Sequence, residues 1–259
     1  MTKIIEINGD VLPHKAIIGL AKGYVHALVL KNFYDVTLLS SVCENILKSP
    51  DKGYLNHAKE FEKIGHAYSE VSTARQKKLY HSNVEKNKQI IKNFFPVGND
   101  PMEKFQLLLN NAWPKGARLL TMESQKCFAG ICRILNPNIN LDPHTDKIER
   151  NFLNQNVILE SQLSANLYLK MPSTGGEVDF WDLEPSDSDY EKLKRQRHYG
   201  ISRLDLPPPS ATYKPNAGEL LILNSRKIHA VKNSETERRI TLSCFIAYFG
   251  NDEPLRYWS

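Results

Sequence analysis

The chain has 259 residues, of which 41% are hydrophobic and 24% charged, a composition typical of a compact globular protein with one sizeable core or two small ones. No export signal or run of about 18 apolar residues is present, and the four scattered cysteines have neither zinc-site spacing nor a dense disulfide pattern, so we expect a cytoplasmic protein without a membrane span. The net charge is only +5, and no basic stripe is interleaved with aromatic residues, which argues against a nucleic-acid partner and equally suits a small acidic metabolite.

Helical patterns dominate the first part of the chain, from about residue 33 to 113. Asp35 can cap a helix whose apolar residues recur at helical spacing until Pro50 stops it. Pro101 can occupy the first turn of a later helix, in which Phe105 and Trp113 belong to one apolar stripe. We predict further helices over 55–66, 73–94 and 101–113, and a mainly helical flank over residues 1–117.

From about residue 118, short apolar runs alternate with Gly, Pro, Asn and Asp, which indicates strands and tight turns. The predicted strands cover 127–135, 163–171, 176–181, 219–224, 228–232 and 238–248. Several short strands of this kind predict a sandwich or jelly roll. The expected fold is therefore a single α+β domain, with a β core over 118–248 and a C-terminal tail over 249–259. A charged segment, Ser186 to His198, is predicted to be a helical excursion from this core.

A candidate metal site lies in the second half. His144 and Asp146 are two residues apart, so on an extended backbone both point to the same face. His229 follows in Ser225 to Val231, next to a predicted strand, and two histidines with one carboxylate form a facial triad that leaves iron positions open. His-x-Asp alone also fits a surface turn. The larger order favours the metal site: a strand before the pair, Gly175-Gly176 before another strand, and a strand before His229.

Ten residues after His229 comes Arg239, in a predicted strand. Arg239 shares one face of this strand with Thr241 and Ser243, whereas the adjacent Arg238 must point to the other face. An inward guanidinium beside hydroxyls suits a carboxylate, because its planar fork donates two parallel hydrogen bonds. The alternative is an exposed arginine on an edge strand.

The order His144-x-Asp146, His229 and Arg239-x-Thr241 resembles the Fe(II)/2-oxoglutarate dioxygenases over about residues 118 to 248. Their core is a double-stranded β-helix, that is, a jelly roll. The stretches FAGICRIL, LSANLYLKMPSTGGEVDFWD and GELLILNSRKIHAV resemble more closely the bacterial branch that hydroxylates or chlorinates free amino acids.

This resemblance implies an enzyme that uses Fe(II), 2-oxoglutarate and O2, with His144, Asp146 and His229 as catalytic metal ligands. It also implies that the far carboxylate of 2-oxoglutarate meets Arg239. Halogenases of this branch carry Gly or Ala in place of the carboxylate ligand, so the presence of Asp146 favours hydroxylation, with release of succinate and CO2. Thr241, Asn166 and Tyr168 are further candidates for holding the cosubstrate, although Asn166 and Tyr168 also fit the wet polar side of a strand.

Three residues are candidates for binding the substrate. Trp181, after Gly175-Gly176-Glu177, and Trp258, near the C-terminus, could border a pocket, although aromatic residues are more often part of the core. Arg133 lies on the strand before the metal loop and could bind a substrate or cosubstrate carboxylate, or form a structural salt bridge instead.

The predicted function is hydroxylation of an unactivated carbon of a free amino acid or a similar small metabolite. The alternatives are a hydroxylase of a peptidyl or carrier-bound substrate, and a β-core binding module without chemistry. Nucleic-acid demethylases of the superfamily have a second Arg six residues after the first. Six residues after Arg239 this chain has Phe245, which argues against that activity. The sequence does not decide the oligomeric state.

Overall fold

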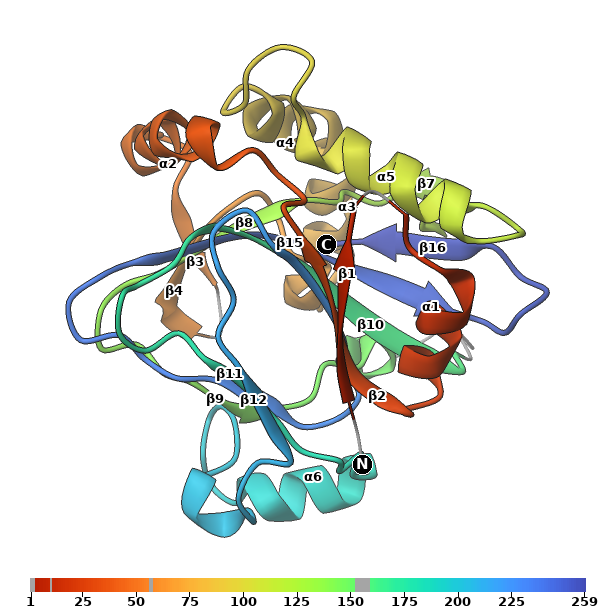
Figure 1. Ribbon diagram of the computed structural model, residues 1–259, viewed down its shortest axis with the longest axis vertical. Helices are drawn as coiled ribbons and strands as arrows, with labels where there is room; N and C mark the ends of the chain where they lie inside the picture. The colour runs from red at the N-terminus through yellow and green to blue at the C-terminus, as the bar shows by residue number, and fades with distance from the viewer. Residues whose placement is uncertain (1–2, 10, 56–57, 152–158) are drawn as a thin grey trace.

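Two β-sheets face each other in the computed structural model, which describes residues 3–9, 11–55, 58–151 and 159–259 (Figure 1). The large sheet contains, in spatial order, β1 (Lys3–Asn8), β2 (Val25–Lys31), β13 (Leu220–Asn224), β10 (Ser161–Lys170), β15 (Arg239–Tyr248), β8 (Ile131–Leu135), β4 (Ala58–Ile64) and β3 (Gly53–Leu55). Strand β16 (Leu255–Trp258) also pairs with β15, and β5 (Ala117–Leu119) pairs with β16. The small sheet has the order β12 (Ala211–Tyr213), β11 (Val178–Phe180), β14 (His229–Val231) and β9 (Leu141–His144). Strands β6 (Thr121–Met122) and β7 (Gln125–Lys126) form a separate hairpin.

The helices lie outside the two sheets. They are α1 (His14–Ala21), α2 (Leu39–Lys48), α3 (Ala74–Ser82), α4 (Val84–Lys92), α5 (Pro101–Ala112) and α6 (Asp187–Lys194). In Figure 1, α2, α4 and α5 lie above the large sheet, whereas α6 lies at the opposite end of the molecule. The predicted start of α5 is confirmed, because Asp100 accepts a hydrogen bond from the backbone N–H of Met102 and Pro101 stands in the first turn. In the part of the chain that the structure describes, every helix is too short or too polar to cross a bilayer.

Several predicted boundaries differ from the structure. The helix predicted over 55–66 is wrong, because residues 58–64 form β4, which pairs with β8 in the large sheet. The helix predicted over 73–94 is two helices, α3 and α4, that meet at Asn83. Of the strand predicted over 127–135, only β8 is a strand. The predicted flank, 1–117, also supplies β1 to β4 to the large sheet, and the predicted tail, 249–259, contains β16.

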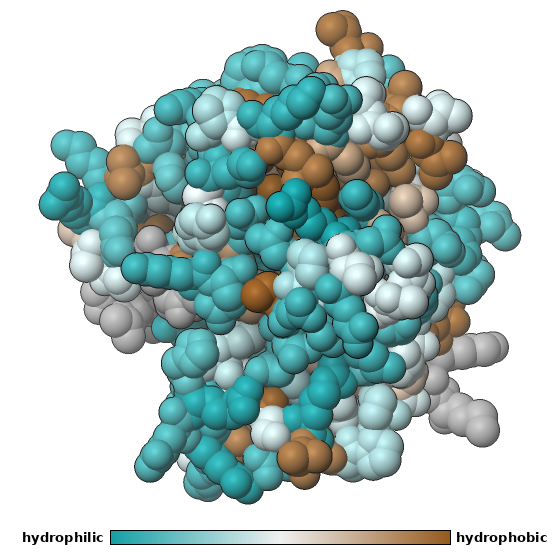
Figure 2. Space-filling view, turned by 90° about the vertical axis from the view of Figure 1, so that its left-hand side faces the viewer, coloured by the Kyte–Doolittle hydropathy of each residue, from teal (hydrophilic) through white to brown (hydrophobic). Residues whose placement is uncertain are grey.

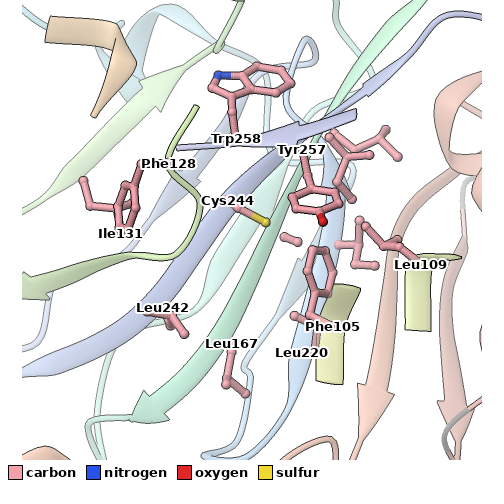
Figure 3. Close-up of a cluster of buried hydrophobic side chains, with 14 of the residues drawn as sticks. Phe105, Leu109, Phe128, Ile131, Leu167, Leu220, Leu242, Cys244, Tyr257 and Trp258 are labelled. Atoms are coloured by element: carbon pink, nitrogen blue, oxygen red, sulfur yellow. The ribbon is translucent and has the colours of Figure 1, made fainter. Parts of the chain in front are cut away.

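The central strands of the large sheet separate a hydrophobic core from a polar interior. Side chains alternate along a strand, so Leu167 of β10 and Leu242 of β15 lie on one face, with Cys244. Figure 3 shows this face packing against Phe105 of α5 and Tyr257 of β16. The opposite face of the same strands looks toward the small sheet. The hydrophobic core therefore holds in place the central strands of the large sheet, whose other face borders the space between the two sheets.

Phe105→Ala should destabilise the protein by about 3–5 kcal/mol, because the Phe105 side chain is only 2% exposed and its loss leaves a cavity against the sheet. Leu107→Ala, on the same helix but 61% exposed, is the matched control and should change stability by less than about 0.5 kcal/mol. Urea unfolding of both variants measures the difference. Equal losses would show that α5 does not anchor the core.

Candidate active site

Antiparallel pairing of β9 with β14 places His144 directly opposite His229. Asp146 follows β9 by two residues, and its Oδ2 lies 3.8 Å from Nε2 of His144 and 3.6 Å from Nε2 of His229. One ligand atom of each residue lies within 4.8 Å of the others. The structure therefore brings together all three predicted metal ligands at one end of the small sheet.

The two imidazoles are oriented by their own backbone. Nδ1 of His144 donates to the carbonyl oxygen of Asp142 at 2.7 Å, and Nδ1 of His229 donates to that of Lys227 at 3.0 Å. A carbonyl can only accept, so each Nδ1 carries a proton, and Nε2 is the ring nitrogen that faces Asp146 and could bind a metal ion. This is the arrangement that metal coordination requires.

Local electrostatics hold His144 and Asp146 in the protonation states that a bound cation needs. Burial, with the neighbouring His229, lowers the pKa of His144 to about 4, so its ring is neutral near pH 7. Burial raises the pKa of Asp146, whereas the adjacent His144 and His229 rings lower it, and the net pKa lies well below the ordinary value. A neutral imidazole and a carboxylate are good donors for a divalent iron ion, and His229 offers a second imidazole beside them.

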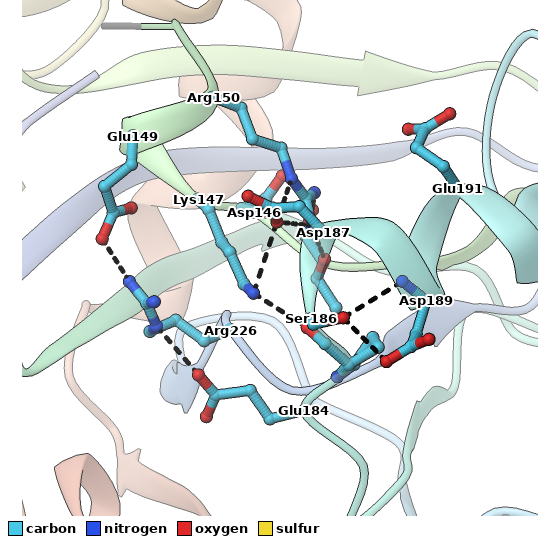
Figure 4. Close-up of polar contacts among 12 residues, drawn as sticks. Asp146, Lys147, Glu149, Arg150, Glu184, Ser186, Asp187, Asp189, Glu191 and Arg226 are labelled. Atoms are coloured by element: carbon cyan, nitrogen blue, oxygen red, sulfur yellow. Dashed lines mark hydrogen bonds and ion pairs between the residues drawn. The ribbon is translucent and has the colours of Figure 1, made fainter.

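Ion pairs beside Asp146 hold its loop against α6 and against the segment before β14 (Figure 4). The Asp146 backbone N–H donates to the carbonyl oxygen of Ser225 at 2.8 Å. Arg150 donates to the Thr145 carbonyl oxygen at 2.8 Å and pairs with Asp187 at 3.0 Å. These contacts fix the position of the carboxylate relative to the β14 ligand.

A second set of contacts reinforces the same junction from the other side. Arg226, three residues before His229, pairs with Glu149 at 2.6 Å and with Glu184 at 2.9 Å (Figure 4). One guanidinium thus links the segment after Asp146, the segment before α6 and the segment before β14. The loops that carry the metal ligands are therefore tied to one another.

The triad opens into a cavity of about 120 Å³ between the two sheets, and Arg239 lies in its lining. Arg239 is 7% exposed, as expected for an inward residue, whereas Arg238 is exposed and donates to Asn136 Oδ1 at 2.8 Å. The Arg239 guanidinium lies over the Tyr168 ring at 5.3 Å, and its Nε and Nη1 are buried without a hydrogen-bond partner. A buried guanidinium with unsatisfied N–H groups fits an anionic ligand, because leaving it unpaired is costly.

Hydroxyl and amide groups continue this polar lining on β10 and β15. Ser243 Oγ donates to Asn166 Oδ1 at 2.8 Å, and Asn166 Nδ2 donates to Ser164 Oγ at 3.1 Å. Tyr168 is directly opposite Thr241, and both side chains are about 1% exposed. Asn166 and Tyr168 line the cavity, so both point inward as candidates for a cosubstrate site should.

The three candidate substrate residues have different surroundings. Arg133 lines the cavity of the triad. Trp258 lines a neighbouring cavity of about 480 Å³, to which Asp146 and Phe245 also contribute. Trp181 packs in a separate apolar cluster with Tyr190 and donates through Nε1 to the Pro207 carbonyl oxygen, so it lines neither of these two cavities.

Tyr199 is a site residue that the sequence did not indicate. Its ring lies 5.4 Å from that of His144 and 5.5 Å from that of Phe61, and burial raises its pKa well above the ordinary value. Gly200 permits this placement, because it has φ +65° and a Cβ there would lie 2.6 Å from the Asp142 Cβ. In the sequence, the glycine that follows Tyr199 was the signal that could have indicated this residue. Phe61 was missed because β4 was predicted to be helical.

The side of the molecule that faces the viewer in Figure 2 is mostly hydrophilic, with hydrophobic side chains gathered toward the top of the view, at the height of the outer helices. The apolar side chains of the space between the sheets, such as Val178, Leu223 and Val231, are buried. The candidate metal ligands thus border a cavity between the sheets that has apolar walls and a few convergent polar groups, as small-molecule sites do.

Comparison with known proteins gives one family match over nearly the whole chain. The family model described as "Carrier-protein-independent halogenase WelO5" matches residues 5–259. Leucinostatins biosynthesis cluster protein S of Purpureocillium lilacinum is 28% identical over 186 residues, which cover 68% of this chain and 75% of that protein. L-isoleucine 3(1)-dioxygenase of Pantoea ananatis is 27% identical over 146 residues, which cover 51% of this chain and 47% of that protein.

Solved structures show the fold. An N-substituted L-amino acid dioxygenase from Burkholderia ambifaria superposes with a TM-score of 0.66 at 16% identity, covering 95% of this chain and 91% of that chain. A structure of this dioxygenase in complex with alpha-KG, which is 2-oxoglutarate, has a TM-score of 0.64 at 17% identity, covering 95% and 90%. The predicted α+β fold with a jelly-roll core is confirmed.

His144→Ala and His229→Ala should each abolish stoichiometric iron binding, because each removes one of three protein ligands. His198→Ala is the matched control, since the His198 side chain is 74% exposed and lies outside this cluster. Iron content after anaerobic loading and desalting gives the result. One equivalent of iron retained by either site variant would remove that histidine from the ligand set.

Proposed function

The chain belongs to the family described as carrier-protein-independent halogenase WelO5, and from that premise we propose that this Fe(II)- and 2-oxoglutarate-dependent oxygenase is a hydroxylase. Its substrate would be a free amino acid or a small amino-acid-like metabolite, hydroxylated at an unactivated carbon. Succinate and CO2 would be the other products.

The observation that carries this proposal is the Asp146 carboxylate beside both imidazoles. Its Oδ2 lies within 4 Å of Nε2 of His144 and of His229, where a carboxylate ligand would complete the facial triad. A halogenase of the amino-acid branch that this sequence resembles needs that coordination position for chloride. Asp146 leaves no such vacancy, so the same cavity favours transfer of oxygen.

Each group of residues has its own part in the proposed reaction. His144, Asp146 and His229 would hold Fe(II), which together with 2-oxoglutarate and O2 supplies the oxidising chemistry. Arg239 would bind the distal carboxylate of 2-oxoglutarate, Asn166 and Tyr168 would line the same subsite, and Thr241 would lie beside it on β15. The apolar walls between the sheets would keep water from the reacting carbon.

Two observations support an amino-acid substrate. The cavity beside the triad is small, about 120 Å³, and carries unpaired guanidinium groups suited to carboxylates. The L-isoleucine and N-substituted L-amino acid dioxygenases are similar to this chain in sequence and in fold respectively.

Arg239→Ala should weaken 2-oxoglutarate binding by about a hundredfold or more, because removing one partner of a buried ion pair costs roughly 3–5 kcal/mol. Arg238→Ala, the adjacent exposed residue, is the matched control and should change the affinity little. The dissociation constants come from anaerobic titrations of each variant with Fe(II) and 2-oxoglutarate. A larger loss in Arg238→Ala would contradict the assignment of Arg239 and, with it, that of Thr241.

The wild-type protein, supplied with Fe(II), 2-oxoglutarate and the twenty amino acids, should add one oxygen to at least one of them, with equivalent succinate. Added chloride should leave the hydroxylated product dominant, because Asp146 fills the position that a halide would take. Asp146→Gly should lose hydroxylation. Mass spectrometry of the products distinguishes the outcomes. Mainly chlorinated product would contradict hydroxylation, and turnover only of peptidyl or carrier-bound substrates would contradict the free-amino-acid assignment.

A further inference from the structure

Arg133 is a second cation in the cavity lining that has no ion-pair partner in the described part of the chain. Its Nε is buried without a hydrogen-bond partner, and among the residues that the structure describes its guanidinium forms no ion pair within 4 Å, including with Asp146. Arg133 lies on β8, directly opposite Thr241 of β15 and Lys63 of β4. Its side chain therefore lies on the same inner face of the large sheet as Arg239, one strand further along.

The other charged groups in the cavity lining already have partners or roles. Lys63 forms a buried ion pair with Glu70, each side chain being 8% exposed. Glu62 accepts a hydrogen bond from the Tyr54 hydroxyl at 3.3 Å. Asp146 belongs to the metal-ligand cluster. None of these groups forms an ion pair with Arg133 within 4 Å.

Arg133 and Arg239 also repel each other. Thr241 is opposite Arg133 and two residues from Arg239, so the two arginines are diagonal neighbours on adjacent strands, with Cα atoms roughly 7–8 Å apart. Burial lowers the pKa of Arg239, and the charge of Arg133 contributes to the same shift. Two cations this close in the cavity lining, Arg239 buried and Arg133 half-buried, can accept two anionic groups when the site is filled.

One 2-oxoglutarate molecule would provide only one free carboxylate, because the resemblance to the Fe(II)/2-oxoglutarate dioxygenases implies that its other carboxylate binds the metal. We propose that Arg133 binds the free carboxylate of the substrate, while Arg239 binds that of 2-oxoglutarate. This inference rests on the proposed function and deepens it. It makes a negatively charged carboxylate a requirement for turnover, so amides, esters and carrier-linked thioesters of the same acids are poor substrates.

The wild-type protein provides the first test. Loaded with Fe(II) and 2-oxoglutarate, it receives either a pool of the twenty free L-amino acids or a pool of their C-terminal amides, and succinate is measured. The free acids should stimulate succinate formation at least about a hundredfold more strongly than the amides, since a charge-assisted bidentate contact is lost in the amide. Equal stimulation would overturn the role of Arg133 and leave the proposed function intact. No stimulation by either pool would contradict the twenty free amino acids as substrates of the proposed function, and the inference with it.

Arg133→Gln provides the second test, with Arg118→Gln on β5 as the matched control, because Arg118 is exposed and lines neither cavity beside the triad. Arg133→Gln should raise the half-saturating concentration of the free-amino-acid pool by about a hundredfold, whereas Arg133→Lys should recover part of the loss because it retains the charge. The 2-oxoglutarate dissociation constant from anaerobic titration should stay within about twofold of wild type, since no contact to 2-oxoglutarate is removed. If Arg133→Gln instead weakens 2-oxoglutarate as strongly as Arg239→Ala does, Arg133 belongs to the cosubstrate site and the inference is wrong.

Discussion

The pairing of β9 with β14 is the constraint on which the site depends. It places His144 across from His229, and the hydrogen bond from Asp146 N–H to Ser225 then brings the carboxylate to both rings. A shift of one residue in this register would turn His144 to the other face of the sheet. The ion pairs of Arg226 and Arg150 with neighbouring acidic residues hold the loops around that pairing in place.

The same two strands, β10 and β15, build both the core and the site. Their outer faces supply Leu167 and Leu242 to the core, while their inner faces supply Tyr168 and Arg239 to the cavity. The buried, unpaired guanidinium of Arg239 carries an energetic cost that an anionic ligand would offset. Cosubstrate binding should therefore stabilise the folded protein by linkage, as any ligand specific to the native state does.

Family membership does not by itself identify the reaction of this chain, because proteins that share a fold can catalyse different reactions. The matching family is described by a halogenase, yet Asp146 stands beside the two imidazoles as a third potential ligand. In the proposed function, this one side chain takes the metal position that a halide ion would otherwise occupy. The neighbouring unpaired arginines, Arg133 and Arg239, point to carboxylates as the groups that the cavity recognises.

The sequence by itself determined the candidate ligands, the inward face of Arg239 and much of the β core, because side-chain alternation and capping are local properties of the chain. Only the tertiary structure decided that residues 58–64 form a strand, since β4 depends on pairing with the distant β8. It also placed Arg133 and Tyr199 in the cavity and Trp181 in a separate apolar cluster. These outcomes depend on contacts between segments that are far apart in the chain, and the local periodicity of the sequence carries no information about such contacts.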